Sequence, residues 1–372
     1  MFTNLRTPAV LVDRQRVLRN IERVQTLANA SGIRLRPHAK THKSPVVARW
    51  QLDRGAVGIC CAKLGEAEVF AGAGVRDIRL PYPVHPSNAA RVAALMDRAS
   101  LSIIVDHPVV ARGWSDAMQQ AGRRLDVLIK VDVGFHRCGI DPACDALGFV
   151  RMVAGLPGLK LRGLLSHAGH GYHGQSEEEL AKIAADEASI LTRLRDDAAG
   201  AGIVLDEISV GATPTLRFSA SLRGITELRP GNYVYFDRTQ VALGAATLDD
   251  CALTVLATVV TKHDGRIILD CGSKTLTNDQ ARGITKAPGF GAVLEDAASP
   301  DPRINEALTI ERLSEEHATV RVAGSTRLEP GDRVQVLPNH SCVVSNMVDA
   351  VHLVEGDRFV ETIPVAARGQ IT

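Results

Sequence analysis

Residues 33–43 read IRLRPHAKTHK, a short strand-like run that passes directly into a cluster of basic and histidine side chains. The run predicts a strand at Ile33–Arg36. Before it, Val17, Ile21 and Val24 recur at helical spacing, so an amphipathic helix leads into the strand. Helix, strand and polar loop in this order indicate a β/α architecture.

The same alternation continues through the first two thirds of the chain. Several of its runs are almost continuously apolar, as expected of parallel strands that are covered on both faces. The strand-like runs are Ile33–Arg36, Val57–Cys61, Asp77–Pro81, Leu101–Asp106, Asp126–Asp132, Lys160–His167, Val204–Val210 and Tyr233–Phe236. Eight such units predict an α/β fold with a TIM-type barrel, which together with an N-terminal strand occupies residues 1–245.

The pattern of predicted secondary structure changes after residue 245. Turn signals such as Asp264-Gly265 and Pro330-Gly331 separate short strand-like runs, and no long amphipathic helix is evident. The runs are Leu253–Thr261, Arg266–Asp270, Ala318–Val322, Arg333–Val336, Ala350–Leu353 and Phe359–Val365. They predict a separate C-terminal β domain over residues 246–372.

The composition narrows the classes of function. The formal net charge of +1 and an aromatic content of 4% give no basic face and no stacking platform, so we expect no nucleic-acid partner. No run approaches 18 apolar residues, so we expect no membrane partner. The seven cysteines are unevenly placed and the N-terminus does not resemble a signal peptide, which favours a reduced, cytoplasmic setting.

Lys40 is the first candidate for chemistry, because it directly follows the first predicted barrel strand. In such barrels the C-terminal ends of the strands face the active site. A lysine that is desolvated or crowded by other cations can lose its proton and attack an aldehyde, and His38 and Lys43 are near enough in sequence to crowd it. A basic surface loop is the alternative for a lone lysine.

Seven segments in a fixed order carry a resemblance to a known family. They are Arg36–Lys43, Gly58–Glu68, Val131–Ile140, Ser166–Tyr172, Ser209–Thr215, Glu227–Asp237 and Leu337–Val344. The chain resembles fold-type III pyridoxal-phosphate enzymes, within the group of D-threonine aldolases, D-serine dehydratases and D-threo-3-hydroxyaspartate dehydratases. The resemblance implies an alanine-racemase-like barrel with a C-terminal β domain, pyridoxal 5′-phosphate as cofactor, Lys40 as its Schiff-base lysine, and a homodimer.

The resemblance also implies which side chains surround the cofactor ring. Arg137 would face the pyridine nitrogen, to which a protonated guanidinium can only donate, so the ring withdraws electrons weakly. A salt bridge at the barrel rim is the alternative for Arg137. Tyr172 would lie against the cofactor. His167, at a predicted strand end, would pack beside the ring or orient the lysine, unless it only satisfies a core hydrogen bond.

A phosphate site is expected in the loops after the seventh and eighth strands, a common position in such barrels. Gly231 permits close approach of the backbone, Thr213 supplies a hydroxyl, and Asn232 is the next residue in the second loop. A structural turn is the alternative for either segment alone.

His340 and Cys342 are two residues apart, so in an extended segment both side chains would share one face. Imidazole and thiolate are good zinc ligands, and only two protein ligands leave positions open for substrate. A buried cysteine beside an incidental histidine is the alternative. The resemblance implies a divalent metal here, for which the thiolate favours zinc over manganese.

The His-x-Cys form resembles the dehydratases, whereas the aldolases more usually carry His-x-Asp. We therefore expect a small D-amino-acid substrate and a D-serine or D-threo-3-hydroxyaspartate dehydratase that yields a keto acid and ammonia. Lys40 would take the α-proton, and a metal on His340 and Cys342 would assist hydroxide loss. The alternative is a D-threonine aldolase that yields glycine and an aldehyde. A racemase is less expected, since the β domain has no tyrosine to serve as a second base. A non-catalytic cofactor carrier is less expected as well, since it would lack the second domain.

Overall fold

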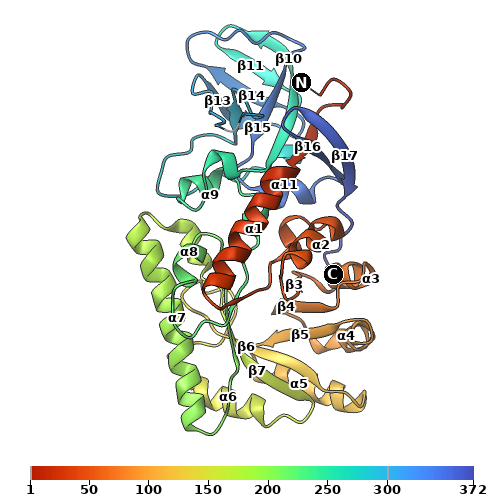
Figure 1. The fold of residues 1–372 in the computed structure, drawn as a ribbon, viewed down its shortest axis with the longest axis vertical. Helices are drawn as coiled ribbons and strands as arrows, with labels where there is room; N and C mark the ends of the chain where they lie inside the picture. Colours follow the sequence, from red (N-terminus) through yellow and green to blue (C-terminus); the bar gives the residue numbers. More distant parts are fainter. Residues whose placement is uncertain (1, 300) are drawn as a thin grey trace.

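The computed structural model describes residues 2–299 and 301–372. The chain forms two lobes, and the long helix α1 (Arg14–Ala30) runs from one to the other (Figure 1). One lobe is a parallel barrel surrounded by helices, and the other is built on a mostly antiparallel sheet. The predicted fold class is therefore confirmed. Within the described residues, no helix combines the length and the apolar character that a membrane crossing requires.

The barrel consists of eight strands that pair in parallel. In spatial order they are β2 (Arg34–Leu35), β9 (Glu227–Leu228), β8 (Glu207–Val210), β7 (Leu159–Leu165), β6 (Leu125–Lys130), β5 (Ser100–Val105), β4 (Asp77–Pro83) and β3 (Ile59–Cys60). Closure occurs between β2 and β3, where Cys60 N donates to Pro37 O at 2.8 Å. The C-terminal ends of all eight strands consequently meet at one rim.

The prediction of the eighth strand at Tyr233–Phe236 is wrong. The strand is β9, earlier in the chain, and the predicted run begins within the 3-10 turn η4 (Asn232–Val234). Tyr233 and Tyr235 are both fully buried, so the run is apolar because it packs into the core and not because it pairs. A short apolar run alone does not distinguish a strand from a buried turn.

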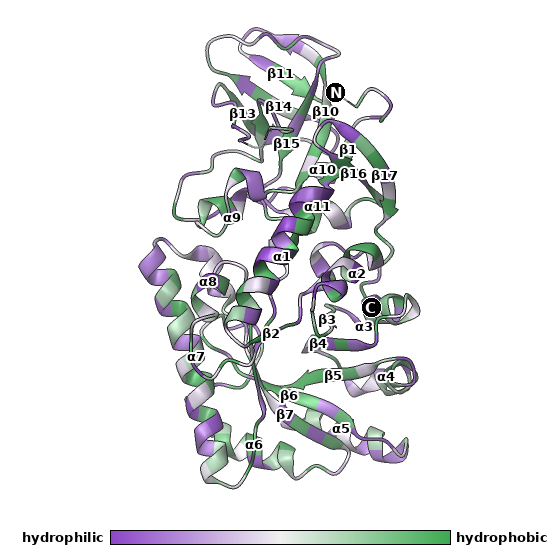
Figure 2. Cartoon of the chain, in the orientation of Figure 1, coloured by the Kyte–Doolittle hydropathy of each residue, from purple (hydrophilic) through white to green (hydrophobic). Residues whose placement is uncertain are grey.

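The helices occupy the connections between the strands. Ser176 Oγ accepts from Glu179 N at 3.1 Å and caps α7 (Glu177–Gly200), along which hydrophilic and hydrophobic residues alternate (Figure 2). The others are α2 (Pro45–Asp53), α3 (Leu64–Gly72), α4 (Ala89–Met96), α5 (Pro108–Gln120), α6 (Ala146–Ala154), α8 (Leu216–Ser219), α9 (Arg238–Ala242), α10 (Ser273–Leu276) and α11 (Ser341–Asn346). Their apolar faces and the barrel strands share one continuous core.

The second lobe contains a nine-stranded sheet. Its main path is β13 (Leu308–Leu313), β14 (Ala318–Val322), β11 (Arg266–Leu269), β10 (Leu253–His263), β1 (Ala9–Asp13), β16 (Ala350–Glu355) and β17 (Arg358–Pro364), while β15 (Arg333–Leu337) pairs with β10 and β12 (Ala292–Leu294) pairs with β15. The N-terminal strand β1, expected alongside the barrel, instead pairs with β10 and β16 in this sheet. The boundary between residues 245 and 246 stays a prediction.

Candidate active site

A cavity of about 240 Å³ opens at the rim where the barrel strands end. The side chains that line it come from both lobes. All nine residues singled out from the sequence are among them: Lys40, Arg137, His167, Tyr172, Thr213, Gly231, Asn232, His340 and Cys342. A second cavity of about 260 Å³ adjoins the first, since Tyr172 and His340 line both.

Lys40 lies in the 3-10 turn η1 (Ala39–Thr41), which His38 caps by accepting from Lys40 N at 3.2 Å. Its Nζ is 3.1 Å from the Tyr82 hydroxyl. Burial lowers the pKa of Lys40, but Tyr82 and Cys342 outweigh it, so the net direction is upward. The expected crowding by Lys43 is wrong, because Lys43 is buried in an ion pair with Glu66 at 3.0 Å.

Tyr82 is the residue nearest to the chemistry that the sequence did not single out. It lies in β4 near the C-terminal end, and its ring has Lys40 Nζ 5.8 Å and the Arg137 guanidinium 5.2 Å from its centroid. His38 meets the same ring edge-on at 5.6 Å. Its position near the end of a predicted barrel strand was the available signal.

Arg137 lies at the exposed rim, between the rings of Tyr82 and Phe135, whose centroids are 5.2 and 5.1 Å away. Among the described residues it forms no ion pair, so the rim salt bridge considered from the sequence is absent there. Its role at the pyridine nitrogen stays a prediction.

A second arginine lies deeper in the same cavity. Arg229 is buried and donates through Nε to Ser209 Oγ at 2.7 Å and through Nη2 to the Ser209 carbonyl at 3.1 Å. Beside it, burial lowers the pKa of Lys130 to about 7. Neither cation was singled out from the sequence, although Lys130 ends β6 and Arg229 lies in the Glu227–Asp237 segment directly after β9.

His167 lies at the end of β7 and is held as a neutral imidazole. Burial lowers its pKa well below the usual value, and nearby Lys40 and Lys130 act in the same direction. Its Nδ1 is 2.6 Å from the Gly211 carbonyl, so Nδ1 carries the proton and Nε2 is left as the acceptor. Tyr172 comes from the turn η3 (Gly169–His173), and burial raises the pKa of its phenol.

The cavity wall offers buried donors that suit an anionic ligand. Within the described residues, His38 Nε2 is buried without a hydrogen-bond partner, and Thr213 Oγ1 is buried with only the Tyr172 phenol as a polar neighbour. His38 Nδ1 accepts from a backbone amide, so in the neutral ring Nε2 is the donor. At Gly231 a Cβ would lie 3.1 Å from His38 Cβ and 3.2 Å from Thr41 Oγ1, so a side chain there would fill the cradle. The site fits the phosphate of pyridoxal 5′-phosphate.

His340 and Cys342 face one another, although the expected extended segment is wrong. His340 is the N-cap of α11 and Cys342 lies in its first turn. Burial lowers the pKa of His340, but Asp279 and Cys342 outweigh it and raise it to about 11. Burial raises the pKa of Cys342, but His340 outweighs it and the net direction is downward. An imidazole beside a thiolate is a donor set that suits zinc.

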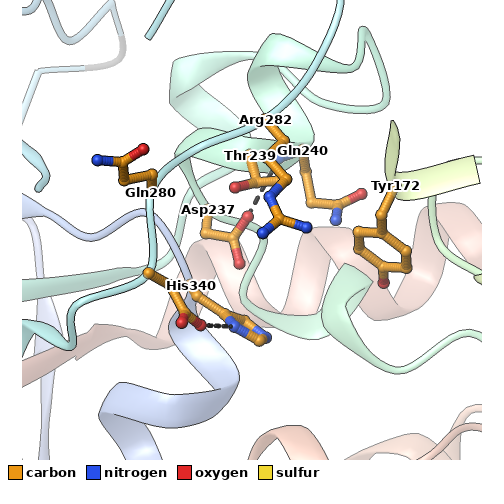
Figure 3. A pocket seen from close by; sticks show the side chains of 8 residues that line it. Tyr172, Asp237, Thr239, Gln240, Gln280, Arg282 and His340 are labelled. Atoms are coloured by element: carbon orange, nitrogen blue, oxygen red, sulfur yellow. Dashed lines mark hydrogen bonds and ion pairs between the residues drawn. The ribbon is translucent and has the colours of Figure 1, made fainter. Parts of the chain in front are cut away.

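Asp279 supports this pair and was not found from the sequence. Its Oδ2 is 2.6 Å from His340 Nδ1, which orients the ring as carboxylates commonly orient metal-binding histidines. A dashed line at His340 marks this contact in Figure 3, and both residues line the adjoining cavity. Within the described residues, no group of three or more histidine, cysteine or acidic side chains is arranged to hold a metal.

The fold and the cavity together define a class of protein. A parallel β/α barrel that presents a lysine after its first strand, joined to a β domain, is the alanine-racemase-like architecture of fold-type III pyridoxal-phosphate enzymes. Residues 12–239 match the family described as alanine racemase, N-terminal domain, and residues 252–354 match the one described as putative serine dehydratase domain. The chain belongs to this alanine-racemase-like family, with the dehydratase-type second domain.

Individual relatives carry two kinds of name. The chain is 32% identical to D-threo-3-hydroxyaspartate dehydratase of Delftia sp. (strain HT23) over 96% of both chains. It is 33% identical to D-threonine aldolase of Arthrobacter sp., over 98% of this chain and 93% of the relative. The solved structure of the Delftia dehydratase matches with a TM-score of 0.90 at 32% identity, covering 97% of both chains. All of these relatives are lyases, which confirms the predicted enzyme class.

Proposed function

We propose that this chain is a pyridoxal-phosphate-dependent lyase that removes water from a D-β-hydroxy amino acid and yields a keto acid and ammonia. The observation that carries the proposal is that Lys40 and the His340–Cys342 pair line one cavity, although they lie 300 residues apart in the chain. Lys40 would serve chemistry at the α-carbon, and the His340–Cys342 pair would assist loss of the hydroxyl.

The cofactor would be held by residues from five barrel loops. Lys40 would bond to its aldehyde, Thr213, Gly231 and Asn232 would surround its phosphate, and the remaining contacts would come from Arg137, His167 and Tyr172. Arg229, which is buried in the same cavity, is a second candidate for a contact with the ring of the cofactor. When bound, pyridoxal phosphate supplies an electron sink for the α-carbon.

Lys40 is placed to move the α-proton. Once free of the cofactor, its amine would serve as the base, and the Tyr82 hydroxyl, 3.1 Å from Nζ, would accept a hydrogen bond from the ammonium it becomes. The neutral His167 adds no competing charge to the same wall.

The His340–Cys342 pair would hold a divalent metal, which we propose to be zinc on account of the thiolate, with manganese as the alternative. A cation held there would supply Lewis-acid stabilisation for the departing hydroxide. A solved relative supports this reading, since a cysteine-to-alanine variant of the D-threo-3-hydroxyaspartate dehydratase is described as the metal-free form.

The test is a panel of D-serine, D-threonine and D-threo-3-hydroxyaspartate, scored separately for ammonia and for aldehyde. We expect ammonia and a keto acid, and we expect chelation to abolish both until zinc or manganese is restored. Undiminished keto-acid formation by rigorously metal-free enzyme would contradict the proposed role of a metal held by His340 and Cys342. Glycine and an aldehyde in place of ammonia would select the second candidate function, that of a D-threonine aldolase. The similarity to the Arthrobacter D-threonine aldolase is the observation that favours this candidate.

Two further parts of the proposal concern the setting of the protein. We propose a homodimer in the cytoplasm, as the family resemblance and the uneven cysteine usage favour. Light scattering of the purified protein tests the first part, because a monomer mass would contradict it.

A further inference from the structure

The second cavity adjoins the cavity that contains Lys40, and they meet at His340, one of the two proposed metal ligands. It shares Tyr172 and His340 with the cavity that contains Lys40, and its lining includes Asp279 and Arg282, of which Arg282 is labelled in Figure 3. If the β-hydroxyl of a substrate is drawn to His340 and Cys342, the second cavity is the space that adjoins its β-carbon on the side of His340. The lining of the second cavity is therefore the place to look for a residue that recognises a second group on that carbon.

Arg282 is the arginine in this lining. Its side chain is exposed and projects toward the space between Asp237 and Tyr172 (Figure 3). Among the described residues it forms no ion pair with a carboxylate, and its polar contact is His173 Nε2 at 3.2 Å. A guanidinium in this state is free to bind an incoming carboxylate through two parallel hydrogen bonds.

The two carboxylates in the same lining are engaged with other partners. Asp279 accepts from His340 at 2.6 Å. Asp237 is buried and accepts from Ser341 N at 3.0 Å and from Gln240 N at 3.1 Å. Among the described residues neither forms an ion pair with Arg282, although the guanidinium, after the hydrogen bond from His340, helps to lower the pKa of Asp279.

The backbone around Arg282 is fixed against the rest of the site. At the neighbouring Gly283 a Cβ would lie 2.6 Å from the backbone of Ala242, so the loop packs closely on α9. Thr285 N donates to Ala242 O at 3.1 Å, and Asn339 Nδ2 donates to the Asp279 carbonyl at 3.0 Å. These contacts hold Arg282 at the cavity.

We propose that Arg282 binds a carboxylate on the β-carbon of the substrate, so that the chain prefers a dicarboxylic β-hydroxy amino acid such as D-threo-3-hydroxyaspartate over D-serine. This inference rests on the function proposed above. D-serine has only hydrogen at that position and leaves the guanidinium without a partner, and the methyl group of D-threonine offers it no acceptor.

The experiment compares the holoenzyme with its Arg282→Gln variant on D-threo-3-hydroxyaspartate and on D-serine. We expect kcat/KM for the dicarboxylate to fall about 10- to 100-fold, and that for D-serine to change less than about threefold, the scale on which one charged hydrogen-bonding partner discriminates. Lys286→Gln removes an exposed charge from the same loop outside both cavities, so it serves as the matched control. Arg282→Lys should restore part of the preference.

An equal loss on both substrates would overturn the proposal, because Arg282 would then serve a group that they share. So would an equal effect of Lys286→Gln, or a wild-type preference for D-serine. A binding readout separates this proposal from the proposed function: the change in cofactor absorbance on titration with D-aspartate and with D-alanine. If no β-hydroxy substrate is turned over but only D-aspartate binding weakens in Arg282→Gln, the lyase function fails and the carboxylate site stands.

Discussion

Glu227 in β9 is the centre of a buried ionic network within the barrel. It is fully buried and accepts from Arg36 Nε at 2.8 Å, from Ser209 Oγ at 2.6 Å, and from Arg79 Nη1. Burial raises the pKa of its carboxyl, but Arg79 and Arg36 outweigh it and lower the pKa from 4.5 to about 2. Replacing it by glutamine would leave both guanidinium groups buried beside a neutral amide.

The size of the effect follows from that pKa. Each unit corresponds to about 1.4 kcal/mol, so a fall from 4.5 to about 2 indicates roughly 3 kcal/mol of stability at pH 7. Removing one partner of a buried ion pair typically costs about 3–5 kcal/mol, which agrees. A depressed folded-state pKa stabilises above pH 4.5, the unfolded value, and this contribution is lost as the pH falls toward 2.

The assay is denaturant unfolding of the wild type and Glu227→Gln, followed by far-UV circular dichroism at several pH values. We expect the wild type to be more stable by about 3 kcal/mol at pH 7, with a gap that narrows below pH 4.5. Glu68→Gln is the control, because Glu68 forms a half-exposed pair with Arg91 at 2.9 Å, a kind worth about 0–1 kcal/mol. Equal losses in the two variants, or a gap independent of pH, would refute the reasoning.

Three further predictions concern the cavity. Lys40→Ala should abolish both turnover and the visible absorbance of the bound cofactor; retained absorbance that borohydride can still fix to the protein would place the reactive amine elsewhere. Because Tyr82 helps to raise the pKa of Lys40, Tyr82→Phe should shift the pH profile of cofactor uptake by the apoenzyme to lower pH, and an unchanged profile would contradict this. Cys342→Ser should lower bound zinc, measured by elemental analysis, and reduce turnover at least about 10-fold while the cofactor spectrum is kept; full zinc occupancy would exclude the thiolate as a ligand.

The strands that the sequence predicts well are those whose pairing and burial coincide. β5 and β6 are long apolar runs, and the predicted ranges differ from the observed ones by only a residue or two. The sequence did not predict β9 because one of its two residues is Glu227, whose charge is paired with Arg79 in β4 and with Arg36 just after β2. The pattern of neighbouring residues does not reveal partners such as these arginines, which are distant in the sequence.

The residues of the candidate site also fall into those that the sequence predicts and those that it does not. Lys40 and His167 could be proposed because parallel strands bring every C-terminal strand end to one rim, whichever residues occupy the helices. Asp279 and Arg282 could not, since they lie in an irregular loop whose position depends on contacts with α9 and Asn339. For these residues the tertiary contacts alone create the site.

Thr41 links the two halves of the proposed chemistry. It follows Lys40 in the turn η1, and its Oγ1 lies 3.2 Å from Cys342 Sγ, while its carbonyl accepts from Ser345 Oγ in α11. The C-terminal segment fastens the same region, since Ala367 N donates to Lys43 O at 3.0 Å. Direct contacts therefore fix the position of the turn η1, which carries Lys40, relative to the His340–Cys342 pair. Their relative position does not depend on the arrangement of the two lobes alone. Because removal of the α-proton and loss of the β-hydroxyl occur on adjacent carbons, such a relation is what a dehydratase requires.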